Sequence, residues 1–176
     1  DISDIANMIR NQRTDDLAEA AELTKKYPDL WEECTVAALN NTDAATTLSK
    51  LQEAILDAFP AAPDTRFTVS YIDECMEDYL APAFYITSPI DDYTDNSIFI
   101  NQSTDTSTVE YFTTLAHEGY PGHLYQTVMS YEAGLADVRN LFNYPGYVEG
   151  WATYVEMLSY YYTGLDDNVA SMLQHN

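Results

Sequence analysis

Basic side chains are scarce in this sequence. Its 176 residues include 7 lysines and arginines against 29 aspartates and glutamates, which gives a formal net charge of −22. A protein that binds nucleic acid needs Lys and Arg to replace the counterions of the phosphates, and an anionic membrane surface attracts basic segments for a similar reason. We therefore expect neither nucleic acid nor an anionic membrane surface as a partner.

Long apolar runs are missing as well. No stretch approaches the roughly 20 apolar residues that a membrane helix needs, so we expect no membrane segment in this chain. The first residue is Asp1 rather than Met, and a helical pattern is cut off at Asn176. These ends predict an excised piece of a longer protein, which would work together with the remaining parts of its parent. An apolar content of 46% still predicts a packed core.

Cysteine occurs at two positions, Cys34 and Cys75. They form no Cys-x-x-Cys pair, which excludes a thiolate metal site of that type and a thioredoxin-like motif. The sequence leaves open whether the two thiols are free and buried or joined in a disulfide.

Hydrophobic periodicity predicts a mostly helical α+β fold. Residues 42–59 carry apolar side chains at helical spacing behind Thr42, which we expect to cap the helix. Three shorter stretches alternate as strands do, and we expect them to form a small antiparallel group: 67–71, 83–86 and 97–101. From Ser107 onward the chain is predicted to be mainly helical, because Ser107 and Glu110 have the spacing of a capping box.

Two of the three histidines lie in the string His-Glu-Gly-Tyr-Pro-Gly-His over residues 117–123. In the zinc signature His-Glu-x-x-His the two imidazoles share one helix face, whereas a spacing of six residues separates them by about 240° in an unbroken helix. Pro121 does not fit a helix interior and Gly122 tolerates a positive φ, so we predict a bulge that returns His123 to the face of His117. The alternative is a helix that ends at Tyr120 and leaves both histidines as ordinary polar residues.

A second string, over residues 148–156, predicts a helix with an apolar stripe and a polar line of Glu149, Thr153 and Glu156. A catalytic zinc site takes three protein ligands and keeps one position open, and a carboxylate from this helix would supply the third ligand. The alternative is an exposed pair of glutamates on an amphipathic helix. Glu156 is expected either to support a histidine ligand or to face solvent, and the sequence leaves this open.

Both strings resemble known families. Residues 149–156 are similar to the Asn-Glu-Gly-Phe-Ala-x-Tyr-x-Glu segment of gluzincins of the aminopeptidase N type, although Val148 replaces the usual Asn. The Pro-Gly insertion resembles the bacterial domain of unknown function 885 family, related to the zincin metallopeptidases, with His-Glu-x-x-Pro-Gly-His and Glu-Gly-Trp-Ala-x-Tyr-x-Glu. The resemblance implies that Glu149 is the third zinc ligand. It also implies a zincin-like catalytic segment over 65–176, with a kinked active-site helix and a second ligand-bearing helix, after a helical segment over 1–64.

The expected function is zinc-dependent hydrolysis of peptide bonds, with Zn²⁺ bound by His117, His123 and Glu149. Glu118 would act as the general base on the water at the metal. Tyr147 is a candidate for stabilising the oxyanion, as is the neighbouring Tyr144. The strand at 98–101 is expected to lie along the cleft and to pair with the substrate backbone. The resemblance implies a bacterial protein, and a secreted or cell-surface location is one expectation.

Arg139 is the only basic residue after Arg66. The catalytic segment thus offers little to hold a C-terminal carboxylate or an acidic peptide, and we predict a preference for neutral or cationic peptides. Two alternatives to a working hydrolase remain. One is a non-catalytic acidic helical interaction domain, and the other is an inert fragment of a metallopeptidase with a retained or lost metal site.

Overall fold

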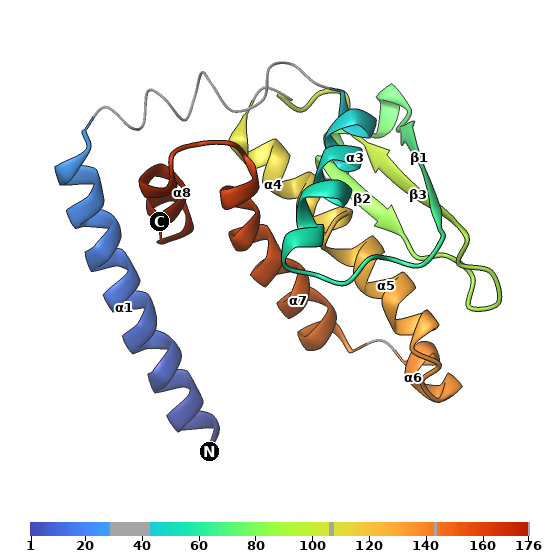
Figure 1. The fold of residues 1–176 in the computed structure, drawn as a ribbon, viewed down its shortest axis with the longest axis horizontal. Helices are drawn as coiled ribbons and strands as arrows, with labels where there is room; N and C mark the ends of the chain where they lie inside the picture. Colours follow the sequence, from blue (N-terminus) through green and yellow to red (C-terminus); the bar gives the residue numbers. More distant parts are fainter. Residues whose placement is uncertain (29–42, 106–107, 143, 176) are drawn as a thin grey trace.

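A computed structural model describes residues 1–28, 43–105, 108–142 and 144–175 of the chain. Helices dominate it, and one small sheet lies among them (Figure 1). The prediction of a mostly helical α+β fold is therefore confirmed. None of the helices within these ranges combines the length and the apolar character that crossing a membrane requires. Cys34 lies outside the described residues, and Cys75 is an exposed free thiol.

The sheet is mixed rather than antiparallel. It consists of β1 (Arg66–Tyr71), β2 (Ala83–Ile86) and β3 (Asp95–Ile100) in the order β1-β3-β2. β3 lies between the other two strands and runs antiparallel to β2 and parallel to β1. After β1 the chain crosses to the far edge of the sheet, forms β2 there, and then returns as β3 between the two. The expected antiparallel group is thus wrong in one of its two pairings. A 3-10 turn, η2 (Glu74–Tyr79), lies on the way from β1 to β2.

The core forms between this sheet and three helices. These helices are α3 (Ala44–Ala54), α4 (Val109–Glu118) and α5 (His123–Glu132). Leu48 of α3, Ile98 of β3 and Leu115 of α4 are fully buried together in this core. Residues on both sides of the predicted boundary at 64/65 therefore share one hydrophobic core. That domain boundary itself stays a prediction.

Caps begin both α3 and α4. The Asp43 side chain accepts a hydrogen bond from the Thr46 amide at 3.1 Å, and the Thr108 hydroxyl accepts one from the Tyr111 amide, also at 3.1 Å. The predicted caps, Thr42 and Ser107, lie outside the described residues, and the caps observed are their neighbours. A 3-10 turn, η1 (Ile55–Asp57), extends α3 toward the predicted end of this helix.

The remaining helices follow residues 117–123 along the chain or stand apart from them. α6 (Asp137–Leu141) and α7 (Pro145–Ser159) come after α5, and α7 packs against α4 and α5. A 3-10 turn, η3 (Tyr160–Tyr162), leads to α8 (Asp167–His175). Figure 1 shows α1 (Ile2–Lys26) apart from the sheet, and it packs on α8, where Leu23 contacts the buried Val169.

Candidate metal centre

The helix that carries the first histidine is interrupted as the sequence predicts. His117 lies in the last turn of α4, and His123 is the first residue of α5. Between them, residues 119–122 leave the helical path, so that the two imidazole rings meet edge to face with centroids 4.8 Å apart. The predicted bulge therefore brings the two histidines together.

Gly122 allows this bulge for a reason other than the one expected. Its φ is −79°, so the left-handed region is not used. A Cβ at this position would lie only 1.7 Å from the carbonyl oxygen of His117 and 2.4 Å from that of Ala116. The Gly122 amide donates a hydrogen bond to the Ala116 carbonyl at 2.9 Å. Glycine is needed here because two backbone segments touch, and no other residue leaves room for that contact.

Two aromatic residues hold the bulge in place. Tyr120 is fully buried, and its ring packs edge-on against those of Phe67 and Tyr125. Trp151 donates its indole N–H to the carbonyl of Pro121 at 2.8 Å. This bond joins the bulge to α7, the helix that carries Glu149 two residues earlier.

Glu149 projects from α7 toward both histidines. The Nε2 atoms of His117 and His123 lie 3.7 and 3.6 Å from the same oxygen, Oε2 of Glu149. One donor atom from each of the three residues falls within 4.8 Å of the other two. The chain thus brings together the two imidazoles and the carboxylate that the sequence assigned to one metal site.

Glu156, two turns further along the same face of α7, orients the first histidine. Its Oε2 lies 2.8 Å from Nδ1 of His117. This hydrogen bond is the main cause that raises the pKa of His117, against the opposing effect of burial. In the neutral tautomer that donates Nδ1–H to Glu156, the Nε2 atom on the Glu149 side would be free to bind a metal ion. Of the two roles that the sequence left open for Glu156, the supporting one is the arrangement observed.

His123 has a different surrounding. Its Nδ1 is buried and has no hydrogen-bond partner in the described part of the chain. Burial, followed by the proximity of His117, lowers the pKa of His123. A neutral imidazole is the form in which histidine binds a metal ion.

Glu118 lies beside the cluster and is fixed from the sheet. The backbone amide of Tyr85 donates to Oε2 of Glu118 at 2.8 Å. Burial is the main cause that raises the pKa of this carboxyl, while the Tyr85 bond acts in the opposite direction. Tyr85 belongs to β2, an edge strand of the sheet, whereas β3 is paired on both sides. The expectation that 98–101 pairs with substrate is therefore wrong, and the strand beside the site is β2.

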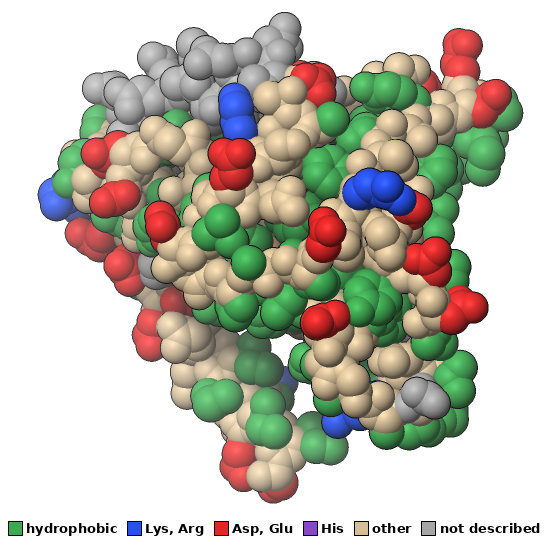
Figure 2. All heavy atoms as spheres, turned by 45° about the vertical axis from the view of Figure 1, so that its right-hand side comes forward, with side chains coloured by type: hydrophobic (Ala, Val, Ile, Leu, Met, Phe, Trp, Pro, Cys, Tyr) green, Lys and Arg blue, Asp and Glu red, His purple; other side chains and the backbone are tan. Residues whose placement is uncertain are grey.

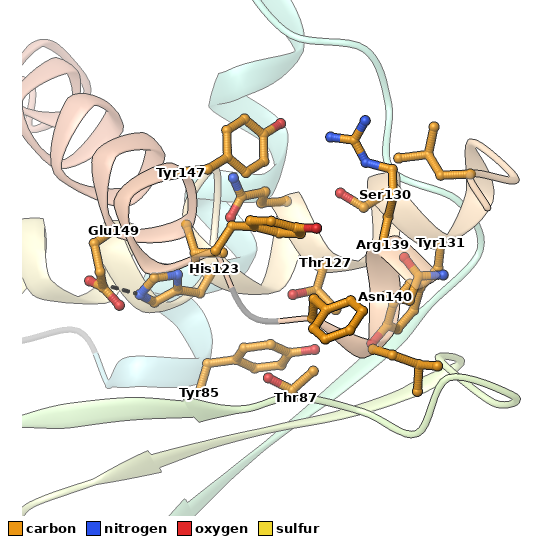
Figure 3. A pocket seen from close by; sticks show the side chains of 16 residues that line it. Tyr85, Thr87, His123, Thr127, Ser130, Tyr131, Arg139, Asn140, Tyr147 and Glu149 are labelled. Carbon is orange, nitrogen blue, oxygen red and sulfur yellow. Dashed lines mark ion pairs between the residues drawn. The ribbon is translucent and has the colours of Figure 1, made fainter. Parts of the chain in front are cut away.

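A cleft of about 460 Å³ opens next to the cluster (Figure 3). His123 and Glu149 lie at one end of it, and Arg139 lies toward the other end. Tyr147 lines the cleft with 63% of its surface exposed, and Tyr144 also lines it. The sequence alone did not place Arg139 at this cleft, although Arg139 stands out in it as the only basic residue after Arg66.

Acidic side chains are spread over the face of the molecule drawn in Figure 2, with few basic ones among them. This surface is consistent with the net charge of −22.

Around the cluster, the three carboxylates of Glu118, Glu149 and Glu156 surround two histidines, an arrangement that favours a cation between them.

The chain belongs to a bacterial family: the family model "Bacterial protein of unknown function (DUF885)" matches residues 2–175. This match confirms the resemblance to that family. A solved structure, "The crystal structure of the putative lipoprotein from Colwellia psychrerythraea", is similar to the chain with a TM-score of 0.62 and 22% sequence identity. The similarity covers 76% of this chain and 23% of that chain. At this identity it shows the fold alone. No curated protein matches the chain.

Proposed function

We propose that this chain is the metal-binding core of a zinc-dependent hydrolase that cleaves peptide bonds. The observation that carries the proposal is the convergence of two imidazole Nε2 atoms on one oxygen of Glu149, at 3.7 and 3.6 Å. A half-buried glutamate, Glu118, adjoins this cluster, and a cleft opens beside it. The chain spans 23% of the similar solved structure, so the activity of the whole protein is part of the proposal.

The donor set fits zinc. Zinc binds histidine nitrogen and carboxylate oxygen at about 2.0–2.2 Å in tetrahedral geometry, which implies ligand atoms about 3.3–3.6 Å apart. The two distances to Glu149 are close to this range, and all three donor atoms lie within 4.8 Å of one another, so the side chains would have to move closer together around a bound ion. Two histidines and one glutamate are a typical ligand set of catalytic zinc, with the fourth position left open.

Each neighbouring residue has a task in such a site. Zinc, when bound, polarises the scissile carbonyl and makes water a better nucleophile at neutral pH. Glu118 accepts the proton of the attacking water and passes it to the leaving amine, while the Tyr85 amide holds its carboxylate in position. Glu156 keeps the ring of His117 oriented through Nδ1.

The edge strand β2 is suited to the substrate backbone. Because the Tyr85 amide points away from β3 and toward Glu118, this side of β2 faces the site. An extended peptide that adds to this edge would pass close to the general base. Tyr147, on the wall of the cleft, stays a candidate for stabilising the oxyanion.

A structural zinc site in a non-catalytic acidic domain is the less favoured alternative. Such sites use four protein ligands and are closed, whereas the cluster found among the described residues has three and adjoins a cleft. The name of the similar solved structure, "putative lipoprotein", supports a cell-surface location as a further part of this proposal.

Hydrolysis of a mixed peptide library by the purified, zinc-loaded protein tests the function. We expect cleavage that a chelator abolishes and that Glu118→Gln reduces at least a hundredfold, within the usual range for a general base. Glu110→Gln, an exposed glutamate on the same helix, is the matched control and is expected to retain full activity. Undiminished cleavage by Glu118→Gln would remove Glu118 from the base role. Normal zinc content without cleavage would support the inert fragment or the non-catalytic domain.

A further inference from the structure

We propose that Arg139 binds a carboxylate of the substrate and so selects peptides that carry one close to the scissile bond. This inference rests on the proposed hydrolase function and names the substrate class of the same cleft. It assigns a specificity-determining role to the single basic residue of the segment that follows Arg66.

The guanidinium of Arg139 has no carboxylate partner within salt-bridge distance in the described part of the chain. This is notable in a protein with 29 acidic residues, and Arg66 illustrates the contrast. Arg66 forms a two-pronged hydrogen bond with Asp95, at 2.8 and 3.0 Å. Arg139 is exposed on the short helix α6 and keeps its charge available for a ligand.

The position of Arg139 relates it to the metal cluster. It lines the same cleft as His123 and Glu149, and it lines a smaller adjoining cavity with Tyr144 and Tyr147. In Figure 3 the Arg139 side chain lies near the Ser130 end of the cleft, away from Glu149. One arginine therefore stands at the end of a cleft that starts at the proposed zinc site.

The length of the cleft sets the distance of that carboxylate from the bond to be cleaved. The α5 residues His123, Thr127 and Ser130 line it at helical spacing. Seven residues of α-helix span about 10 Å, which equals about three residues of an extended peptide. A peptide whose scissile carbonyl lies at the metal cluster would thus reach Ser130, near which Arg139 lies in Figure 3, within about three residues.

Arginine is suited to this task because its planar guanidinium binds a carboxylate through two parallel hydrogen bonds. The carboxylate is either the free C-terminus of a short peptide or the side chain of an Asp or Glu. The remainder of the peptide is expected to be neutral or cationic, since the chain carries a net charge of −22. The place of Arg139 in this cleft thus reverses the expectation that the segment offers little to hold a C-terminal carboxylate, although the surrounding acidic surface repels anions.

Three versions of one short neutral peptide test the proposal: the free acid, its C-terminal amide, and an amide with Glu as the last residue. We expect the wild-type protein to hydrolyse the free acid with a kcat/KM at least tenfold above that of the plain amide, from the strength of a charged hydrogen-bonded pair. If the amide that ends in Glu is the only peptide hydrolysed faster than the plain amide, the carboxylate that Arg139 binds belongs to a side chain.

Arg139→Gln should remove this preference through KM, so that the free acid and the plain amide are hydrolysed with similar kcat/KM. Arg139→Lys should restore part of it, because lysine keeps the charge but not the planar fork. Arg10→Gln, an exposed arginine on α1, serves as the matched control and should change nothing. Equal hydrolysis of all three peptides by the wild-type protein would overturn the role of Arg139.

Calorimetric binding of the same peptides to the zinc-loaded Glu118→Gln variant, with and without Arg139→Gln, separates this inference from the proposed function. A preference for either carboxylate peptide that disappears with Arg139→Gln supports the inference even if the wild-type protein cleaves no peptide. Equal binding of all three peptides, or a preference that survives Arg139→Gln, overturns it even if the protein is an active hydrolase.

Discussion

The indole N–H of Trp151 donates a hydrogen bond to the carbonyl of Pro121 at 2.8 Å. This bond connects α7, which carries Glu149, with the bulge that separates the two histidines. The Trp151 ring also packs edge-on against Phe59, with centroids 6.0 Å apart. This bond is therefore one of the contacts that fix Glu149 relative to the two histidines, beside the packing of α7 on α4 and α5.

Trp151→Phe tests this connection. The variant keeps an aromatic ring but loses the donor, and we expect the free energy of unfolding to fall by about 0.5–1.5 kcal/mol. The affinity for zinc should fall together with the stability, because α7 and its Glu149 are then held less firmly against the bulge between the two histidines. Chemical denaturation and zinc titration measure the two effects. Tyr154→Phe, on the exposed side of α7, is the control, and an identical loss in both variants would contradict a specific role for the indole.

Gly122→Ala is expected to damage the bulge. The added Cβ would lie 1.7 Å from the His117 carbonyl oxygen, so the backbone must move and His123 with it. We expect the free energy of unfolding to fall by roughly 1–3 kcal/mol, as for overpacking elsewhere, and zinc binding to weaken by more than tenfold. Gly146→Ala, where a Cβ meets nothing within 4 Å, should leave both unchanged. A Gly122→Ala protein with normal zinc affinity would show that the close approach is not required.

Glu156→Gln removes the charge that faces Nδ1 of His117 while keeping the shape of the side chain. Loss of such an outer partner of a histidine ligand typically weakens metal binding about 10–100-fold. We expect this decrease in competitive zinc titrations, with little change in the folded structure. Glu53→Gln, exposed on α3, provides a charge-matched comparison. Should both variants bind zinc equally well, Glu156 would be a structural partner only.

The net charge of −22 predicts a difference between substrates of opposite charge. Among free-acid peptides that differ in their other side chains, lysine-rich ones should be cleaved about tenfold faster than glutamate-rich ones, because the acidic surface attracts cations. The difference should shrink as salt is added, since screening shortens the range of the field. Faster cleavage of the glutamate-rich set at low salt would refute the predicted preference.

Local patterns in the sequence predicted the helices, the three strands and the bulge. The interruption could be foreseen because a proline and a glycine separate two histidines by a spacing that no regular helix brings to one face. The reason given for Gly122 was wrong, since the contact with the His117 carbonyl depends on how α4 and α5 meet. Such a contact between backbone segments leaves no trace in the periodicity.

The pairing of the strands and the place of Arg139 required the tertiary structure. A strand in the middle of a sheet and one at its edge have similar sequences here, so the pattern alone did not identify β2 as the edge beside Glu118. The isolation of Arg139 was visible in the composition, but its position in the cleft depends on where α6 folds back.

X-ray absorption at the zinc edge of the purified protein tests the metal site most directly. The proposed zinc site predicts one zinc per chain with two imidazole nitrogens and a carboxylate oxygen at about 2.0–2.2 Å. Zinc should be lost in His117→Ala, His123→Ala and Glu149→Ala and retained in Glu110→Gln. Full zinc content in His117→Ala, or a wild-type protein that binds no zinc at millimolar concentration, would contradict it.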